Sequence, residues 1–176
     1  MKTVMNSSNK QRTSSLLSIK SMAIMAMLSG MAIILMLFEI PLWFAPPFYE
    51  LDFSEVPILV GAFALGPMAG VVIELLKILL NLVITGTKTA GVGELANFLI
   101  GCSMVVPAAI IYHRDKTLKS AIKGLIVGTI LMVALGSIMN AFVLLPAYAY
   151  FFKMPIGELI AMGTKVNPAI DNMSTF

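Results

Sequence analysis

The stretch that decides the fold is FEIPLWFAPPFYELDFSEVPILVGAFALGPMAG, residues 38–70. It leaves one apolar run, crosses a segment dense in proline and aromatic side chains, and enters a second apolar run. Pro41, Pro46 and Pro47 exclude a continuous helix, because proline lacks the amide donor and restricts the residue before it. The stretch therefore predicts two apolar helices joined by a rigid aromatic loop. Such a loop forms either an aromatic belt at a membrane surface or a lid over an apolar ligand, and both readings stay open.

Composition places the chain in a membrane. Of its 176 residues 59% are hydrophobic and only 12% are charged, and the mean hydropathy is +0.94. A soluble domain carries about 25% charged residues. The single cysteine, Cys102, excludes a disulfide framework, and one cysteine with one histidine does not make a conventional zinc site. We therefore expect an integral membrane protein with no metal, no cofactor and no nucleic-acid partner.

The N-terminal segment, residues 1–20, is basic and contains no acidic residue. It resembles the start of a signal peptide, but the apolar run after it is too long and lacks a small-residue cleavage site. By the positive-inside rule we interpret it as a cytoplasmic tail. A single transmembrane domain is expected over residues 21–176.

Apolar periodicity and punctuation predict five helices in that domain. A second basic segment, residues 113–123, is expected in the cytoplasm, which agrees with the number of crossings before it. The sequence thus predicts an all-α, multi-pass protein of a bacterial cell membrane, with a cytoplasmic N-terminus. The expected helices cover residues 21–39, 55–65, 68–85, 93–112 and 120–146.

Ionisable residues inside these helices are costly in a bilayer and mark either function or a structural ion pair. Glu74 and Lys77 are spaced i,i+3 near the middle of one helix, so we expect them to pair. An intramembrane enzyme that uses Glu74 or Glu94 as acid or base is a third reading. It is disfavoured because no second catalytic group lies at a credible spacing, and a non-catalytic protein is expected.

Two amides suggest a binding site in the outer half of the membrane. Asn97 lies one turn after Glu94 at the start of a helix, and Asn140 lies in the outer part of the last helix. A buried amide needs hydrogen-bond partners, which a neighbouring helix or a ligand can supply. On the first helix, Ala26 and Gly30 are one turn apart, a spacing that lets another helix approach closely, within this protein or from a partner.

Three segments resemble a known family: ELDFSEVPILVGAFALGPMAGVVIELLKILLN (residues 50–81), GELANFLIG (93–101) and NAFVLLPAYA (140–149). They are similar to the riboflavin-specific substrate-binding component, or S component, of energy-coupling-factor (ECF) vitamin transporters. The resemblance implies a membrane protein that captures riboflavin, as a transported ligand, from outside. It also implies a transmembrane coupling protein and two cytoplasmic ATPases as partners. An S component for biotin or thiamin is the alternative within this class.

The resemblance also implies roles for particular residues. The family's first external loop, which helps to cover the flavin ring, corresponds to residues 42–47, and the asparagine of its fifth helix corresponds to Asn140. The small-residue motif that contacts the coupling protein corresponds best to Ala26 and Gly30, where this chain departs from the usual alanine pair. The expected ligand-binding residues are Leu42, Trp43, Phe44, Ala45, Pro46, Glu94, Asn97, Asn140 and Tyr148.

The family pattern has a sixth helix with an asparagine and a lysine that bind ligand. The last residues of this sequence, 166–176, are polar and have no apolar run long enough to cross a membrane. We therefore expect this helix to be missing from the sequence through a C-terminal truncation, and we expect riboflavin to bind less tightly as a result.

Overall fold

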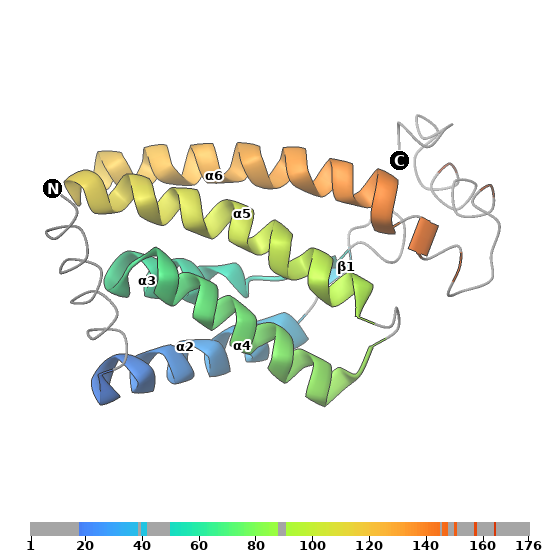
Figure 1. Ribbon diagram of the computed structural model, residues 1–176, viewed down its shortest axis with the longest axis horizontal. Helices are drawn as coiled ribbons and strands as arrows, with labels where there is room; N and C mark the ends of the chain where they lie inside the picture. Colours follow the sequence, from blue (N-terminus) through green and yellow to red (C-terminus); the bar gives the residue numbers. More distant parts are fainter. Residues whose placement is uncertain are drawn as a thin grey trace, which may run out of the picture.

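The computed structural model describes residues 18–38, 40–41, 50–87, 91–144, 146–147, 150, 157 and 164. Within these ranges the chain is helical except for two very short strands (Figure 1). The all-α prediction is confirmed, with four helices long and apolar enough to cross a membrane and a fifth that is shorter. The elements are α2 (Ile19–Leu37), β1 (Ile40–Pro41), β2 (Glu50–Leu51), α3 (Glu55–Leu65), α4 (Pro67–Thr85), α5 (Val92–Asp115), α6 (Leu118–Met139) and the π-helical turn η1 (Asn140–Leu144).

The first helix, α2, is capped at its N-terminus by a serine. The Ser18 side chain accepts a hydrogen bond from the Ser21 amide at 3.2 Å, which satisfies one of the free amides of the first turn. The sequence that follows is almost wholly apolar, so only neighbouring helices decide which face is buried. That face carries Met25, Ser29, Ala32, Ile33 and Met36.

The aromatic loop is closed at its base by a two-stranded ladder, which the sequence did not predict. β1 and β2 pair antiparallel, with Ile40 opposite Leu51 and Pro41 opposite Glu50. The interior of this loop, residues 42–49, lies outside the described residues. The ladder fixes where the loop leaves the bundle and where it returns.

The helices α3 and α4, which agree closely with the expected helices over residues 55–65 and 68–85, form a helical hairpin. Gly66 between them has φ +113°, a left-handed conformation that favours glycine, and Pro67 starts α4 where its missing amide costs nothing. With 11 residues α3 is about 16 Å long, roughly half of a bilayer core. One of its ends must therefore lie within the thickness that the longer helices cross.

The helices α5 and α6 run antiparallel with a connection of only two residues, Lys116 and Thr117. This is shorter than the sequence suggested, because α5 continues through His113 to Asp115 and α6 starts at Leu118. A Cβ at Gly124 would lie 2.6 Å from the Ala108 carbonyl oxygen. Glycine therefore lets these two backbones approach closely, as small residues do between membrane helices.

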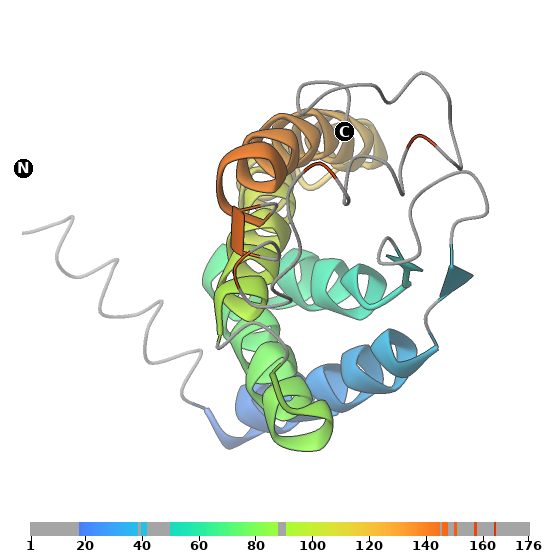
Figure 2. The same cartoon turned by 90° about the vertical axis from the view of Figure 1, so that its right-hand side faces the viewer.

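The elements are arranged around α3 and α4 (Figure 2). α3 contacts α2, α4 and α5, whereas α6 packs mainly on α5. The apolar part of the interior between α3, α4 and α5 is made of small and branched side chains, among them Ile58, Ala62, Ala69, Ile73 and Val105. These residues form a close-packed core that holds α3 in place.

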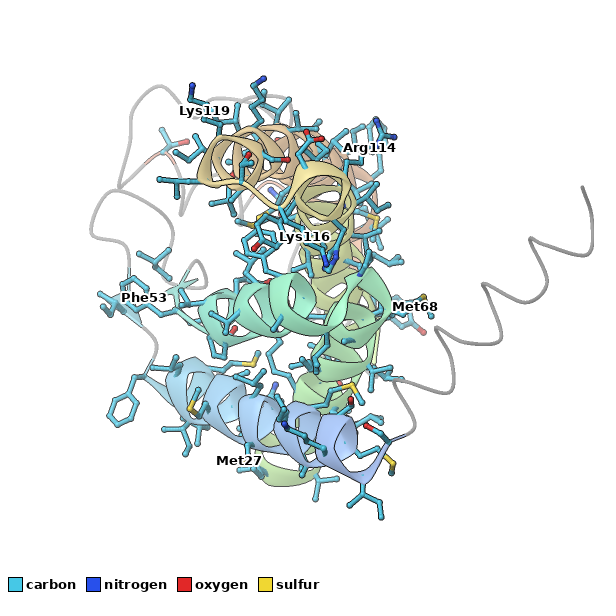
Figure 3. All side chains as sticks on the ribbon, turned by 90° about the vertical axis from the view of Figure 1, so that its left-hand side faces the viewer. Met27, Phe53, Met68, Arg114, Lys116 and Lys119 are labelled. Carbon is cyan, nitrogen blue, oxygen red and sulfur yellow. The ribbon has the colours of Figure 1, made fainter. Side chains whose placement is uncertain are left out.

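The two ends of the bundle differ in charge. The end that carries the α3–α4 turn and the α5–α6 connection is the basic end, where Arg114, Lys116 and Lys119 gather (Figure 3). The opposite end carries the β-hairpin formed by β1 and β2, and we call it the hairpin end (Figure 1). The name refers to these two strands and not to the α3–α4 hairpin, which turns at the basic end. Glu94 and Asn140 belong to the hairpin end, because α5 starts there and α6 finishes there.

Candidate functional site

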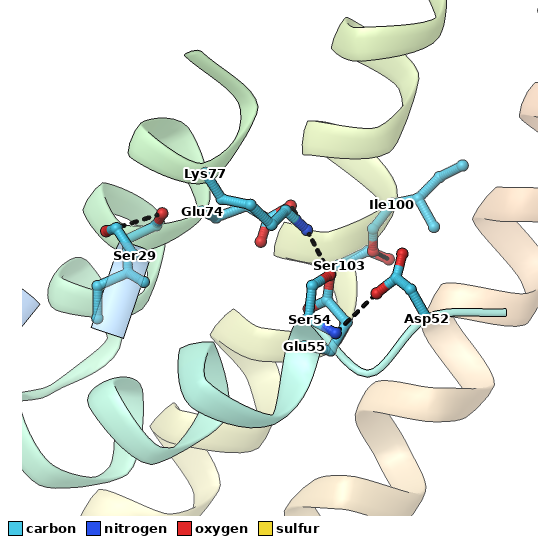
Figure 4. A network of polar contacts seen from close by, with 9 residues as sticks. Ser29, Asp52, Ser54, Glu55, Glu74, Lys77, Ile100 and Ser103 are labelled. Atoms are coloured by element: carbon cyan, nitrogen blue, oxygen red, sulfur yellow. Dashed lines mark hydrogen bonds and ion pairs between the residues drawn. The ribbon is translucent and has the colours of Figure 1, made fainter. Parts of the chain in front are cut away.

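An ion triad lies in the interior of the bundle, between α3 and α4 (Figure 4). The Lys77 ammonium lies 2.9 Å from Glu74 Oε1 and 3.0 Å from Glu55 Oε1. Glu74 and Lys77 are completely buried, with 0% and 1% of the side chain exposed, and Glu55 is 19% exposed. One buried lysine thus pairs with two carboxylates, and one of these, Glu74, is itself fully buried.

The triad is connected to the base of the aromatic loop through Ser54. Lys77 donates to Ser54 Oγ at 3.3 Å, and the Ser54 amide donates to Asp52 Oδ1 at 2.7 Å. Asp52 directly follows β2. The buried charges of α4 are therefore connected by hydrogen bonds to the segment where the loop re-enters the bundle.

Gly101 of α5 forms the opposing wall of the triad. A Cβ at this position would lie 2.6 Å from Glu74 Oε1 and 3.0 Å from Glu55 Oε1. Any larger residue would displace the two carboxylates from their positions beside Lys77. The glycine therefore provides the space that both side chains occupy.

The structure brings Glu74 and Lys77 together, as their i,i+3 spacing predicts, and it adds Glu55, which comes from a different helix. A signal for Glu55 was present in the sequence, since Ser54 and Glu55 begin a helix too short to cross a bilayer. A short helix must start at depth, so its first carboxylate needs a buried cation.

Three polar residues expected at the ligand site lie at the hairpin end: Glu94, Asn97 and Asn140. Gly136 of α6 faces Ile100 of α5: a Cβ placed at Gly136 would lie 3.9 Å from the Ile100 side chain. One turn further along each antiparallel helix, Asn140 is therefore level with Ala96 and Asn97. Asn97 and Asn140 are both half-buried, and Asn140 opens the π-helical turn that ends α6.

Glu94 lies in the first turn of α5, where its charge complements the helix dipole. Its Oε2 atom is buried and accepts no hydrogen bond from the described part of the chain. A buried acceptor of this kind is costly unless a partner supplies a donor. The remaining expected ligand residues, Leu42, Trp43, Phe44, Ala45, Pro46 and Tyr148, lie outside the described residues.

An apolar groove lies elsewhere, between α5 and α6, and none of the expected ligand residues lines it. Its volume is about 490 Å³ and its lining residues are Cys102, Ser103, Val106, Pro107, Leu131 and Leu135. An open groove without converging polar groups lacks the features that orient a ligand. We therefore do not assign it as the candidate site.

The surface of α2 that carries Ala26 and Gly30 is open. Ala26 is exposed, and no atom of the described residues lies within 4 Å of a Cβ built at Gly30. This face lies beside the buried side of α2, and the described part of the bundle leaves it largely uncovered. Across the same described ranges no group of three or more histidine, cysteine or acidic side chains is arranged to hold a metal ion.

A bundle of apolar helices with polar side chains converging in its interior and at one end is typical of a multi-pass membrane protein that binds or transports a small molecule. Residues 20–173 match the family described as the substrate-specific component of ECF transporters. The chain belongs to this family. Membership places it among transport components and not among enzymes, which agrees with the expectation from sequence.

Relatives and a solved structure agree with this placement. The chain is 42% identical to the riboflavin transporter RibU of Staphylococcus aureus (strain TCH60), over 77% of this chain and 70% of the relative. It is 33% identical to the riboflavin transporter FmnP of Bacillus subtilis (strain 168), over 85% and 80%. A solved structure of the S component of a bacterial ECF transporter superposes with a TM-score of 0.68 at 38% identity, covering 86% of this chain and 88% of that one.

Proposed function

We propose that this protein is the riboflavin-binding S component of an ECF importer in a bacterial cell membrane. The observation that carries the proposal is its 42% identity to a protein named as a riboflavin transporter, extending over most of the chain. The geometry adds support, because Glu94, Asn97 and Asn140 provide hydrogen-bonding groups at one end of an apolar bundle. S components for biotin or thiamin are the competing possibilities.

Riboflavin matches these groups in chemical type. Its ring system is flat and largely apolar, and it carries an imide N–H with flanking carbonyls and a chain of hydroxyls. The Glu94 carboxylate accepts hydrogen bonds, whereas the amides of Asn97 and Asn140 both donate and accept. In the proposal the ring lies at the hairpin end, and the family resemblance assigns residues 42–46 and Tyr148 to its binding, where aromatic side chains can stack on it.

A visible absorption spectrum tests the ligand. Protein purified from cells grown with riboflavin should carry a flavin that absorbs visible light and fluoresces, whereas biotin and thiamin do neither. Titration of ligand-free protein with riboflavin should quench flavin fluorescence, and excess biotin or thiamin should not compete. A preparation that binds biotin or thiamin but no flavin would overturn the assignment.

Replacement of Asn140 tests the site. Asn140→Leu should weaken riboflavin binding by about 1–3 kcal/mol, the usual penalty for leaving a polar partner unpaired. Fluorescence quenching measures the change. Asn81→Leu is the matched control, because among the described residues the Asn81 side chain is bonded only to Thr85, at the same helix end. Wild-type affinity in the Asn140 variant would remove this residue from the site.

The family description as a substrate-specific component implies further components in the assembly. In the proposal these are a transmembrane coupling protein and two cytoplasmic ATPases, and the N-terminus and the basic end of this chain face the cytoplasm. The positive-inside rule supports that orientation, since Arg114, Lys116 and Lys119 lie at the basic end. The exposed Ala26 and the uncovered Gly30 are the proposed contact with the coupling protein.

A bulky residue on α2 tests this contact. Gly30→Trp has room in the isolated protein, so flavin binding in detergent should persist while uptake by cells falls. Met31→Trp is the control, since Met31 is exposed and lies about 100° further round the helix. Equal uptake in both variants would place the contact elsewhere, and loss of binding in the Gly30 variant would indicate misfolding.

A further inference from the structure

The ion triad has an uneven balance of charge and of hydrogen bonds. Its three side chains would carry a net charge of −1 if all were ionised, because two carboxylates share one ammonium. Lys77 donates to Ser54 Oγ and to Glu55 Oε1. Glu74 lies beside the same nitrogen, but neither of its oxygens accepts a hydrogen bond from any residue in the described ranges.

An ionised carboxylate in this position is unfavourable. A buried charge is tolerated when it is paired and when hydrogen bonds satisfy its remaining lone pairs. Glu74 is fully buried and has the ion pair alone, while the better hydrogen-bonded Glu55 already balances Lys77. No neighbouring titratable group supplies a positive charge to balance an ionised Glu74, because Asp52 is itself an acid and Cys102 carries a thiol.

We propose that the triad is a buried proton-binding site: Glu74 holds a proton at neutral pH, so that Lys77, Glu55 and Glu74 together are neutral. The proton adds to one carboxylate oxygen of Glu74 and forms a carboxylic acid. Protonation turns this oxygen from an acceptor into an O–H donor inside the cluster. Lys77 and Glu55 remain as a single ion pair.

Neutrality explains how α3 can begin at this depth. Ser54, the N-cap of α3, and the side chain of Glu55, its first residue, are largely buried, and Lys77 supplies a polar partner to both. A second carboxyl group, that of Glu74, is tolerated beside this ion pair when it is uncharged. The inference concerns the protonation of the triad and does not depend on which ligand the protein binds.

Infrared difference spectroscopy tests the proposal directly. A protonated carboxylic acid has a C=O stretching band that ionised carboxylates lack. Wild-type protein in lipid vesicles at neutral pH should show such a band, with an intensity of one acid per protein. Glu74→Gln should remove it. Glu55→Gln should also remove it, because Glu74 must then ionise to balance Lys77.

Two further measurements make the assignment to Glu74 decisive. Gln is the neutral isostere of a protonated glutamate, so Glu74→Gln should keep the wild-type unfolding midpoint, whereas Glu55→Gln should lower it. The reverse order would place the proton on Glu55 and overturn the assignment. Glu94→Gln is the matched control and should keep the band in full. A wild-type spectrum without the band, or a band lost only in the Glu94 variant, would refute the proposal.

Discussion

The helices α4 and α6 are equally apolar, but they are packed very differently. Their most apolar windows have mean hydropathies of 2.0 and 2.1. A third of the α4 window is buried inside the described bundle, against 6% of the span that joins α6 to η1. Apolar composition therefore shows which segments cross a membrane, but it does not show which helix lies at the centre.

The difference follows from how membrane helices associate. Lipid tails are as apolar as leucine, so burying an apolar face against another helix brings little hydrophobic gain, and packing decides. α4 presents Ala69, Gly70 and Ile73 to three neighbouring helices, and it also carries the buried ion pair. α6 offers a narrow face of Ser120, Gly124 and Gly128, mainly to α5.

The same substitution in both helices should show the largest contrast. Ile73→Ala empties a fully buried position and should cost about 2–5 kcal/mol of unfolding free energy through lost packing. Ile130→Ala on α6, where the residue is 62% exposed, should change it by less than about 0.5 kcal/mol. Unfolding by SDS in mixed micelles measures both. Equal costs would show that α6 is buried in the working protein.

The glycine face of α6 should respond more moderately. A Cβ at Gly128 would lie 2.5 Å from the Met104 carbonyl oxygen, so Gly128→Leu should separate α6 from α5 and cost about 1–3 kcal/mol. A Cβ at Gly136 would have its nearest neighbour 3.9 Å away, so Gly136→Ala should leave the free energy of unfolding unchanged. Cysteine cross-linking between the two helices would report the separation, and an unchanged cross-linking yield in the Gly128 variant would contradict the close approach.

The smallest effect is expected where the α3–α4 hairpin is tied to α5 at the basic end. His113 Nε2 donates to the Ala62 carbonyl at 3.1 Å, and the adjacent Tyr112 ring packs at a tilt against the Phe63 ring, with centroids 4.7 Å apart. His113→Ala should cost about 0.5–1.5 kcal/mol by the same SDS assay. His113→Gln retains a donor and should recover part of the loss. No loss in either variant would show that the aromatic contact alone suffices.

Several parts of this architecture could be predicted because they depend on local chemistry. The turn at Gly66 and Pro67 follows from backbone conformations that few other residues adopt, and the pairing of Glu74 with Lys77 follows from their spacing on one helix. The helix ends were harder to predict. Lysine and arginine are good helix formers, so α5 and α6 extend into the basic segment that the sequence suggested as a connection.

The sequence by itself determined that the chain is an apolar helical bundle, where its hairpin turns, and, through long similar segments, the family to which it belongs. Only the tertiary structure decided that Glu55 joins the ion pair, that Gly101 makes room for it, and that Asn140 is level with Asn97. These relations join residues far apart in the chain. They depend on how closely the helices approach and at what depth each one begins, and neither quantity is encoded in the periodicity of a single segment.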